Sequence, residues 1–392
     1  MQVREIKIGI YGVVDAGKTS LTEELTGISF KNSIEQKYKI TLYVNCNSRA
    51  YKKDGETFTQ VSLDSSENKF ILTTLDNPGH FKMLCNSLSN LPFIDIPLLL
   101  IDKESFNQKF FLKYFDLFDF FNFPKVIIVQ TKIDLQNKEQ ILELSEKILN
   151  ETKKYNFEVE LVHYTIFSNK AKNNLLRAIE SSKVKERLNL KNKIFIIKSF
   201  DKNRPGEMIL KDNELLIKNQ KFSGAILGGV NFFEKRNILE ETIMQLGPLY
   251  LDLNNQKKEK ITYIKPKILS TIKTTEELSS IVTLETSLDP GLGSSDNLSG
   301  TILFLEEDFH EQYTLEAKVK KEYFPLLLND KIMINLLNMK LVSQVTKVKR
   351  KGILELKLAK PLPFKYTGPL IIFKQIKNIN KLELAGLAEI IE

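Results

Sequence analysis

Apolar and polar residues follow two different rhythms along the chain, and the change falls near residue 193. Before it, apolar runs alternate with segments of helical spacing. Strands are expected over 5–11, 69–75, 98–101 and 126–129, and helices over 19–25, 138–152 and 173–186. Continuous apolar runs are typical of strands that are buried on both faces of a parallel sheet. Strands that alternate with helices predict a doubly wound α/β domain.

After residue 193 the pattern consists of short strands divided by Pro-Gly, Gly-Gly and Asn-rich turns. These strands are expected over 194–199, 225–230, 249–253, 260–264, 281–285 and 301–305, and then over 316–319, 331–337, 341–348, 353–358 and 370–374. Such spacing predicts two all-β modules, which we expect to be barrels. The predicted organisation is an α/β domain over 1–193, a β-barrel over 194–308 and a second β-barrel over 309–392.

Composition limits the class of protein. The 392 residues are 42% hydrophobic and 27% charged, which is ordinary for a globular protein and excludes disorder, collagen or a coiled coil as a description of the whole chain. Only Cys46 and Cys85 occur, so neither a disulfide framework nor a four-cysteine metal site is possible. The apolar stretch 91–101 is too short to span a bilayer. We expect a cytoplasmic protein of a reducing compartment that has no membrane partner.

Positive charge is concentrated near the end of the chain. The whole sequence has a net charge of +8, and residues 309–392 hold 15 basic and 8 acidic residues, a net of +7. The densest part is Lys347–Gly352, which resembles a hairpin turn. Two interpretations remain open: a solvated turn that discourages edge pairing of strands, or a contact with RNA phosphates.

A phosphate-binding motif lies between the first predicted strand and the first predicted helix. Gly12–Thr19 fits G-x-x-x-x-G-K-S/T, in which glycines let the backbone N–H groups turn toward phosphate oxygens. Lys18 is expected to reach the β- and γ-phosphates, and the hydroxyl of Thr19 to ligate Mg²⁺. The nucleotide-binding residues predicted here are Asp15, Ala16, Gly17, Lys18, Thr19 and Ser20.

Further signals follow in the order typical of a GTPase. Asp76-Asn77-Pro78-Gly79-His80 follows a predicted strand, so that Asp76 can hold Mg²⁺ and the N–H of Gly79 can reach a γ-phosphate. Thr131-Lys132-Ile133-Asp134 follows another strand, and the carboxylate of Asp134 can accept two hydrogen bonds from guanine. Thr41 is a candidate switch threonine for Mg²⁺. The sequence therefore predicts an α/β P-loop GTPase domain followed by two all-β barrel domains, with GTP or GDP and Mg²⁺ as cofactors.

These motifs resemble those of the translational GTPases, the class that includes elongation factor Tu. Within that class the chain is similar to the gamma subunit of eukaryotic and archaeal translation initiation factor 2. The similar segments are Ser199–Gly206 (S-F-D-x-N-x-P-G), Leu288–Pro290 with Asp296–Gly300 (L-D-P…D-N-L-x-G), and Ile127–Asp134. A selenocysteine elongation factor is the nearest competing relative, but it is not expected to carry the barrel segments.

The resemblance implies a function as well as a fold. It implies a heterotrimer with alpha and beta subunits that carries methionylated initiator tRNA to the small ribosomal subunit in the GTP state. It also implies GTP hydrolysis at start-codon recognition, slow without an activating partner, with activating and exchange factors in eukaryotes. His80 takes the place of the residue that orients the attacking water. Thr165 and Ile166 take the place of a Ser-Ala element near the guanine.

The chain departs from the family pattern at several of these positions. Val13 and Ala16 replace two histidines of the phosphate loop, and Thr131 replaces an asparagine. With Cys46 alone in its region, the cysteine-rich knuckle of many members is absent. Two alternatives to the initiation GTPase therefore stay open. One is a GTP-dependent tRNA-binding module with little hydrolysis of its own, and the other is a selenocysteine or elongation-type carrier of aminoacyl-tRNA.

Overall fold

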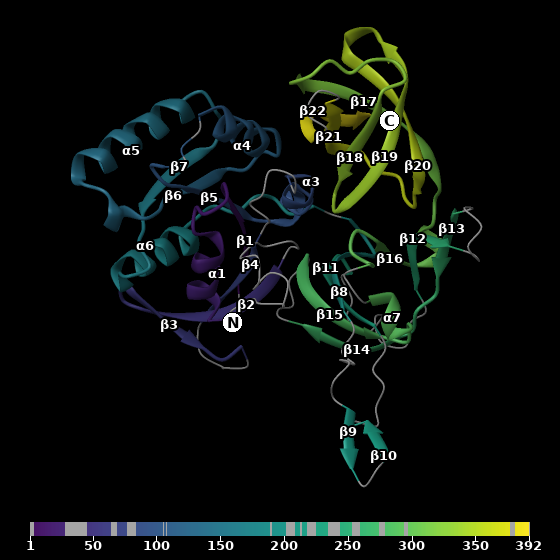
Figure 1. The fold of residues 1–392 in the computed structure, drawn as a ribbon, viewed down its shortest axis with the longest axis horizontal. Coiled ribbons are helices and arrows are strands. Elements are labelled where there is room, and N and C mark those ends of the chain that lie inside the picture. The colour runs from purple at the N-terminus through teal and green to yellow at the C-terminus, as the bar shows by residue number, and fades with distance from the viewer. Residues whose placement is uncertain are drawn as a thin grey trace. The chain divides into compact units, whose positions relative to one another are not determined.

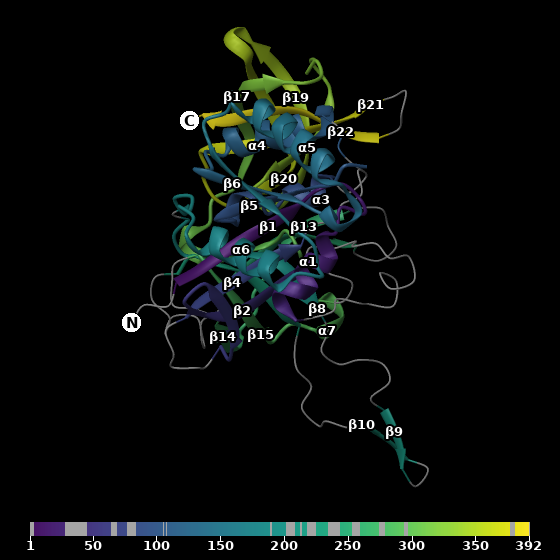
Figure 2. The ribbon, with the colours of Figure 1, turned by 90° about the vertical axis from the view of Figure 1, so that its left-hand side faces the viewer.

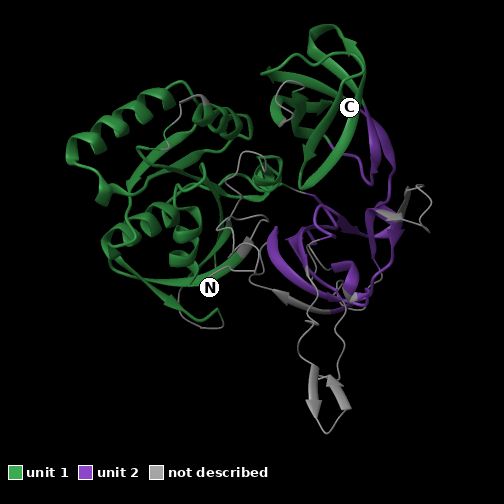
Figure 3. Ribbon diagram, in the orientation of Figure 1, with its two compact units in different colours: residues 1–188, 316–356, 367–392 green, residues 189–315, 357–366 purple. Residues whose placement is uncertain are grey.

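The structure is a computed structural model. It describes residues 4–27, 45–63, 69–76, 84–104, 106, 108–188, 190–200, 208–211, 214–217, 225–233, 244–252, 259–273, 279–293, 297–376 and 381–391. By compactness the chain separates into two units (Figure 3). Unit 1 holds residues 1–188, 316–356 and 367–392, and unit 2 holds residues 189–315 and 357–366. The three-module division at 193 and 308 stays a prediction.

A seven-stranded sheet in the order β3-β2-β4-β1-β5-β6-β7 organises the first part of unit 1. Its strands are β1 (Arg4–Tyr11), β2 (Asn45–Asp54), β3 (Thr57–Val61), β4 (Phe70–Asp76), β5 (Ile96–Ile101), β6 (Lys125–Gln130) and β7 (Glu158–His163). The five strands from β4 to β7 are parallel, as predicted. The sequence analysis did not predict β2 and β3, which extend the sheet in antiparallel pairing.

Helices cover both faces of this sheet (Figures 1 and 2). They are α1 (Lys18–Thr26), α3 (Leu84–Leu88), α4 (Gln108–Phe120), α5 (Lys138–Thr152) and α6 (Asn169–Glu180). Successive side chains of a strand point to opposite faces. Ile8 of β1 therefore shares a buried cluster with Leu21 of α1 and Leu175 of α6. Tyr11 packs on the other face, where its ring centroid lies 5.6 Å from that of Tyr114 in α4.

The last helix of this domain differs from its prediction. The sequence indicated a helix over 173–186, whereas α6 spans Asn169–Glu180. It begins earlier because the side chain of Ser168 accepts a hydrogen bond from the N–H of Ala171 and so caps the first turn. It ends earlier because residues after Glu180 form hydrogen bonds outside the helix. The N–H of Lys185, for example, donates to the carbonyl of Asp95, the residue before β5.

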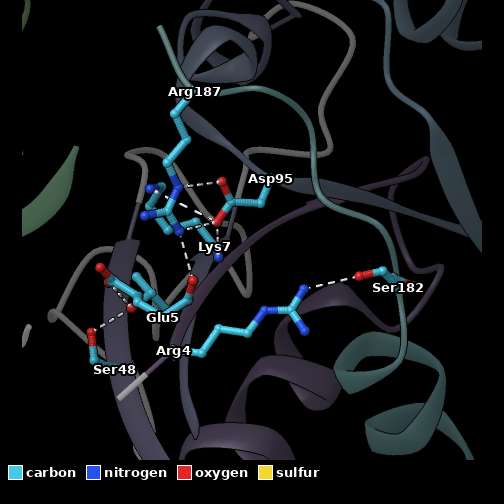
Figure 4. Close-up of polar contacts among 8 residues, drawn as sticks. Arg4, Glu5, Lys7, Ser48, Asp95, Ser182 and Arg187 are labelled. Atoms are coloured by element: carbon cyan, nitrogen blue, oxygen red, sulfur yellow. Dashed lines mark hydrogen bonds and ion pairs between the residues drawn. The ribbon is translucent and has the colours of Figure 1, made fainter. Parts of the chain in front are cut away.

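Buried charges hold this exit segment against β1 (Figure 4). Asp95 is 1% exposed and accepts hydrogen bonds from the N–H of Lys7 at 2.8 Å and from Nε and Nη2 of Arg187 at 3.1 and 3.0 Å. The same Nη2 donates to the carbonyl of Glu5 at 2.6 Å. Arg4 donates to the carbonyl of Ser182 at 3.0 Å. The start of the strand that leads to the phosphate loop is therefore fixed to the segment that leaves the domain.

A second, antiparallel sheet follows, with seven strands in the order β13-β12-β16-β8-β11-β15-β14. The elements of this part are β8 (Lys193–Phe200), β9 (Met208–Lys211), β10 (Glu214–Ile217), β11 (Ile226–Asn231), β12 (Gln245–Asp252), β13 (Glu259–Ile264), β14 (Ile268–Lys273), β15 (Ser280–Thr286), α7 (Pro290–Gly293) and β16 (Ile302–Phe304). Strands β9 and β10 form a separate two-stranded sheet. Ile196, Leu227 and Leu284 contribute to the core of the large sheet.

The remaining strands close into a six-stranded barrel, as predicted, in the order β17-β20-β19-β18-β21-β22. Their bounds are β17 (Gln312–Glu322), β18 (Lys331–Leu336), β19 (Met339–Lys349), β20 (Ile353–Leu362), β21 (Gly368–Ile376) and β22 (Lys381–Ile391). The basic segment is the turn between β19 and β20, where Lys351 has a φ of +63°. Among the described residues, we find no helix whose length and apolar character would let it cross a membrane.

Within unit 1, the barrel contacts α3 and α4. The thiol of Cys85 in α3 donates to Oδ1 of Asn335 at 2.8 Å, and Nδ2 of Asn335 donates back to the carbonyl of Cys85 at 2.6 Å. In α4, Asp116 accepts a hydrogen bond from the hydroxyl of Tyr323 at 2.8 Å. In both contacts the polar groups are hydrogen-bonded. These directional bonds align the barrel with α3 and α4 as well as holding them together.

Candidate functional site

The predicted motifs meet where the parallel strands end. In the ladders, Ile10 pairs with Asp76, Ile101 with Gln130, and Gln130 with His163. The residues that follow these strands therefore share one edge of the sheet. In open α/β sheets, ligands bind at the carboxyl ends of the strands. The edge holds the phosphate loop, the backbone of Asp76, and the loops after β5, β6 and β7.

The phosphate loop has the backbone shape that its glycines predict. The φ angles of Gly12, Asp15 and Gly17 are +144°, +62° and +90°, all in the region that L side chains rarely adopt. A Cβ on Gly12 would lie 2.8 Å from the carbonyl oxygen of Leu100, so a side chain is excluded there. A Cβ on Gly17 would have no heavy atom within 4 Å, so open space adjoins the backbone at the start of α1. This loop can receive an anion such as a phosphate.

The other predicted phosphate-loop residues lie on the loop or on the first turn of α1. Ala16 is buried, whereas Asp15 and Ser20 are exposed and Thr19 is half-buried. Lys18 is 7% exposed, and its ammonium donates to the carbonyl of Val13 at 2.5 Å. The lysine side chain thus folds back over the phosphate loop, where it is expected to contact the phosphates.

The predicted guanine loop is bonded directly to the phosphate loop. The hydroxyl of Thr131 donates to the carbonyl of Ala16 at 3.0 Å. Nε2 of Gln136 donates to the carbonyls of Thr131 and Lys132 at 3.3 and 3.2 Å, which holds Lys132 at a φ of +54°. Asp134 lies exposed in a short 3₁₀ helix over Ile133–Leu135. Its carboxylate is accessible to a base.

Sequence reasoning missed Asp102, which follows β5 at the same edge. It is 2% exposed, and its Oδ2 lies 3.2 Å from Nζ of Lys132. The strand pairing explains this approach, because the N–H of Thr131 donates to the carbonyl of Ile101 at 2.9 Å and the two loops leave the sheet side by side. A charged residue directly after a fully buried apolar run was the signal that could have identified it.

The predicted Ser-Ala counterpart lies beside the guanine loop. The N–H of Tyr164 donates to the carbonyl of Gln130 at 2.8 Å, and Thr165 and Ile166 come next. Ile166 and the following Phe167 are 52% and 81% exposed. Burial, followed by the bond to the Glu24 carboxylate, raises the pKa of Tyr164, so its hydroxyl stays protonated. This loop presents apolar side chains to solvent at the expected position of the base.

Some predicted residues lie outside the described parts of the chain. These are Thr41, Gly79 and His80, the side chain of Asp76, and, from the family-like segments, Asp201–Gly206 and Asp296. In the described parts, no group of three or more His, Cys, Asp or Glu residues could hold a metal ion. The roles assigned to these residues stay predictions.

Comparison with known proteins gives relatives along nearly the whole chain. The chain is 27% identical over 390 residues to translation initiation factor 2 subunit gamma of Methanocaldococcus jannaschii, with 91% of each chain covered. It is 29% identical over 344 residues to the protein of the same name from Methanococcus maripaludis, covering 83% of this chain and 80% of that one.

Solved structures share the fold. The structure of translation elongation factor SelB from Methanococcus maripaludis, in complex with the GTP analogue GppNHp, matches with a TM-score of 0.66 at 17% identity, covering all of this chain and 80% of that one. A bacterial selenocysteine-specific elongation factor also matches with a TM-score of 0.66, and the chain spans 58% of its length.

A family match covers the domain that carries the site. The elongation factor Tu GTP binding domain matches residues 3–203, just over half of the chain. The matched stretch includes the phosphate loop, the guanine loop and the loop after β7. The chain therefore belongs to the family of the elongation factor Tu GTP-binding domain, and it is a GTPase that binds guanine nucleotides.

Proposed function

We propose that this protein is the GTP-binding subunit of a translation initiation factor 2. In this role it binds initiator methionyl-tRNA in the GTP state, delivers it to the small ribosomal subunit and hydrolyses GTP at start-codon recognition. The similarity to archaeal initiation factor 2 gamma subunits, which covers 91% of the chain, supports the assignment. The heterotrimer with alpha and beta subunits and the place of action in the cytoplasm are parts of the same proposal.

One observation carries the nucleotide part of the proposal: the hydrogen bond from Thr131 to the carbonyl of Ala16. It joins the loop expected to recognise guanine to the loop expected to bind phosphates. The two loops are thereby held at a fixed separation before any ligand arrives. Such preorganisation lowers the entropy that binding has to overcome.

Each predicted residue has a distinct task in this proposal. Lys18 and the backbone N–H groups from Asp15 to Ser20 hold the phosphates, and Asp134 selects guanine, with Thr165 and Ile166 beside it. Gly79 donates its N–H to the γ-phosphate, and His80 orients the attacking water.

A magnesium ion fits the predicted donor set, because the hydroxyl of Thr19, the carboxylate of Asp76 and Thr41 all supply the oxygen ligands that Mg²⁺ prefers. When bound, Mg²⁺ neutralises charge on the phosphates. Thr19 lies half-buried on the first turn of α1, directly after Lys18.

Two other functions make different predictions. The structural similarity to selenocysteine elongation factors motivates an elongation-type carrier. The replaced loop residues, Val13 and Ala16, motivate a GTP-dependent tRNA-binding module with little hydrolysis of its own.

Binding assays separate these alternatives. The protein, purified with its native partners, is titrated with initiator and elongator methionyl-tRNA in the presence of GTP or GDP. We expect tight binding of initiator tRNA only with GTP, and equal affinity for both tRNAs would contradict the initiation assignment. Single-turnover hydrolysis with small subunits, compared between the wild type and His80→Ala, then tests the hydrolytic step. A rate independent of His80 would refute its role.

A further inference from the structure

A buried ion pair lies at the edge of the sheet, beneath the predicted guanine loop. Asp102 has a side chain that is 3% exposed, and its Oδ2 lies 3.2 Å from Nζ of Lys132. The side chain of Lys132 is 35% exposed, so it remains partly accessible to a ligand while its ammonium pairs with a buried carboxylate. A carboxylate this deeply buried needs a cation nearby, because removing it from water is unfavourable.

The backbone of the guanine loop is fixed independently of this pair. Thr131 is bonded to Ala16, and Gln136 donates to the carbonyls of Thr131 and Lys132. Those contacts hold the main chain but leave the four-carbon side chain of Lys132 free to change rotamer. Among the described residues, Asp102 is the carboxylate that pairs with its ammonium.

We infer that Asp102 is a positioning residue for guanine-nucleotide binding, acting through Lys132. The inference rests on the proposed placement of the base beside Lys132 and Asp134. The pair fixes the direction of the lysine side chain, so that this partly exposed side chain forms a fixed surface next to the base. A lysine whose rotamer is set in advance loses less conformational entropy when the nucleotide arrives.

The position of the ion pair in the sheet indicates a role in ligand binding in addition to stability. Asp102 is the first residue after β5, and Lys132 is the second residue after β6. Parallel strands place these residues at the edge where ligands bind. A comparable pair, between Lys125 and Glu160 at 2.5 Å, involves the first residue of β6 and therefore lies at the other end of the same strand.

Calorimetric titration with GDP tests the inference in a double-mutant cycle. The proteins are the wild type, Asp102→Asn, Lys132→Met and the double variant. We expect Asp102→Asn to weaken GDP binding about tenfold, which is the size of coupling typical of residues in one ion-pair network. In the Lys132→Met background the same change should have no further effect. Asp102→Glu, which keeps the charge, should recover most of the loss.

Two controls exclude a general structural effect. Glu160→Gln disturbs the pair at the far end of β6 and should leave the affinity for GDP unchanged. Hydrogen exchange of the β5 and β6 peptides confirms that each variant is folded. If Asp102→Asn does not fold, Asp102→Ser takes its place in the cycle.

The outcomes distinguish this inference from the proposed function. Wild-type affinity in Asp102→Asn, or an equal loss with and without Lys132, would overturn the role of Asp102 and leave the nucleotide site intact. Unchanged GDP binding in Lys132→Met would overturn the placement of the base, and the inference with it.

Discussion

Replacing Asp95 by asparagine should destabilise the sheet that carries the nucleotide site. Asp95 is 1% exposed and accepts three hydrogen bonds, from the N–H of Lys7 and from two nitrogens of Arg187. Its Oδ2 also lies 3.8 Å from the ammonium of Lys7, which is fully buried. Asparagine carries no charge and has one acceptor oxygen instead of two, so at least one hydrogen bond from Arg187 or Lys7 is lost and both cations lose their counter-charge.

The magnitude follows from burial. Removing one partner of a buried ion pair costs about 3–5 kcal/mol, because the remaining charge loses its counter-charge in a place where water cannot replace it. Whole domains are stable by only about 5–15 kcal/mol. Asp95→Asn therefore removes a large fraction of the stability without altering any residue of the proposed site.

Native-state hydrogen exchange measures this change locally. Amides of β1 and of residues 183–188 should exchange roughly a hundred- to a few-thousand-fold faster in the variant, which corresponds to the same free energy. Glu143→Gln is the matched control, since it removes an ion pair with Lys147 whose side chains are 65% and 58% exposed. That control should show no measurable change. A loss below about 1 kcal/mol in Asp95→Asn would refute the buried-pair reasoning.

Other consequences can be measured on the same protein. Lys18→Ala should lower GDP affinity at least about a hundredfold while leaving circular dichroism unchanged, because it removes charge-assisted hydrogen bonds worth about 3 kcal/mol together; tight binding by this variant would contradict the phosphate-loop assignment. Asp134→Asn should shift preference from guanine toward xanthine nucleotides in competition titrations, and retained guanine selectivity would mean that the base lies elsewhere. Burial raises the pKa of Cys85 to about 11, so in a Cys46→Ser background its alkylation should be slow at pH 8 and accelerate about tenfold for each pH unit up to that pKa as the thiolate forms; a rate that levels off near pH 9 would disprove the shift. In the basic turn, neutralising Arg350 together with Lys351 should flatten the salt dependence of tRNA binding if the turn contacts RNA, and an unchanged slope favours the solvated turn.

Two of the four basic side chains in the segment Lys347–Gly352 form ion pairs within the barrel. Lys347 pairs with Glu355 at 2.9 Å, and Lys349 pairs with Glu316. For Arg350 and Lys351 we find no acidic partner in the part of the chain that the structure describes. Lys347 and Lys349 therefore form ion pairs between strands of the barrel. Arg350 and Lys351 are the residues to test for a contact with RNA.

Local signals in the sequence were sufficient for some elements. Helix α5 begins and ends where its leucine spacing predicts, because Asn137 and Gln140 form a capping box that fixes its first turn. The continuous apolar runs gave β5 and β6 to within two residues, since strands buried on both faces need no alternation.

Other elements depend on contacts between distant segments. Helix α4 was not predicted, although its sequence is rich in apolar residues, with five phenylalanines and a tyrosine. Its rings pack against Tyr11 in the sheet, while Asp116 binds Tyr323 of the barrel. Strand β2 is largely polar, and its pairing with β4 rather than its own pattern makes it a strand. The sequence marks Asp102 as a charged residue after a buried run, but its pairing with Lys132 depends on β5 and β6 lying side by side.

Thr131 stands in the guanine motif where the family pattern has asparagine, and this difference changes the hydrogen bonds that the loop can make. A carboxamide can accept or donate at the neighbouring loop and still offer a second polar atom to the base, whereas a hydroxyl has a single hydrogen to donate. In this chain the hydroxyl of Thr131 gives that hydrogen to the carbonyl of Ala16. Threonine therefore preserves the link between the two loops but supplies no N–H to the base. Recognition of guanine should then depend more heavily on Asp134, and on a Lys132 side chain held in place by Asp102.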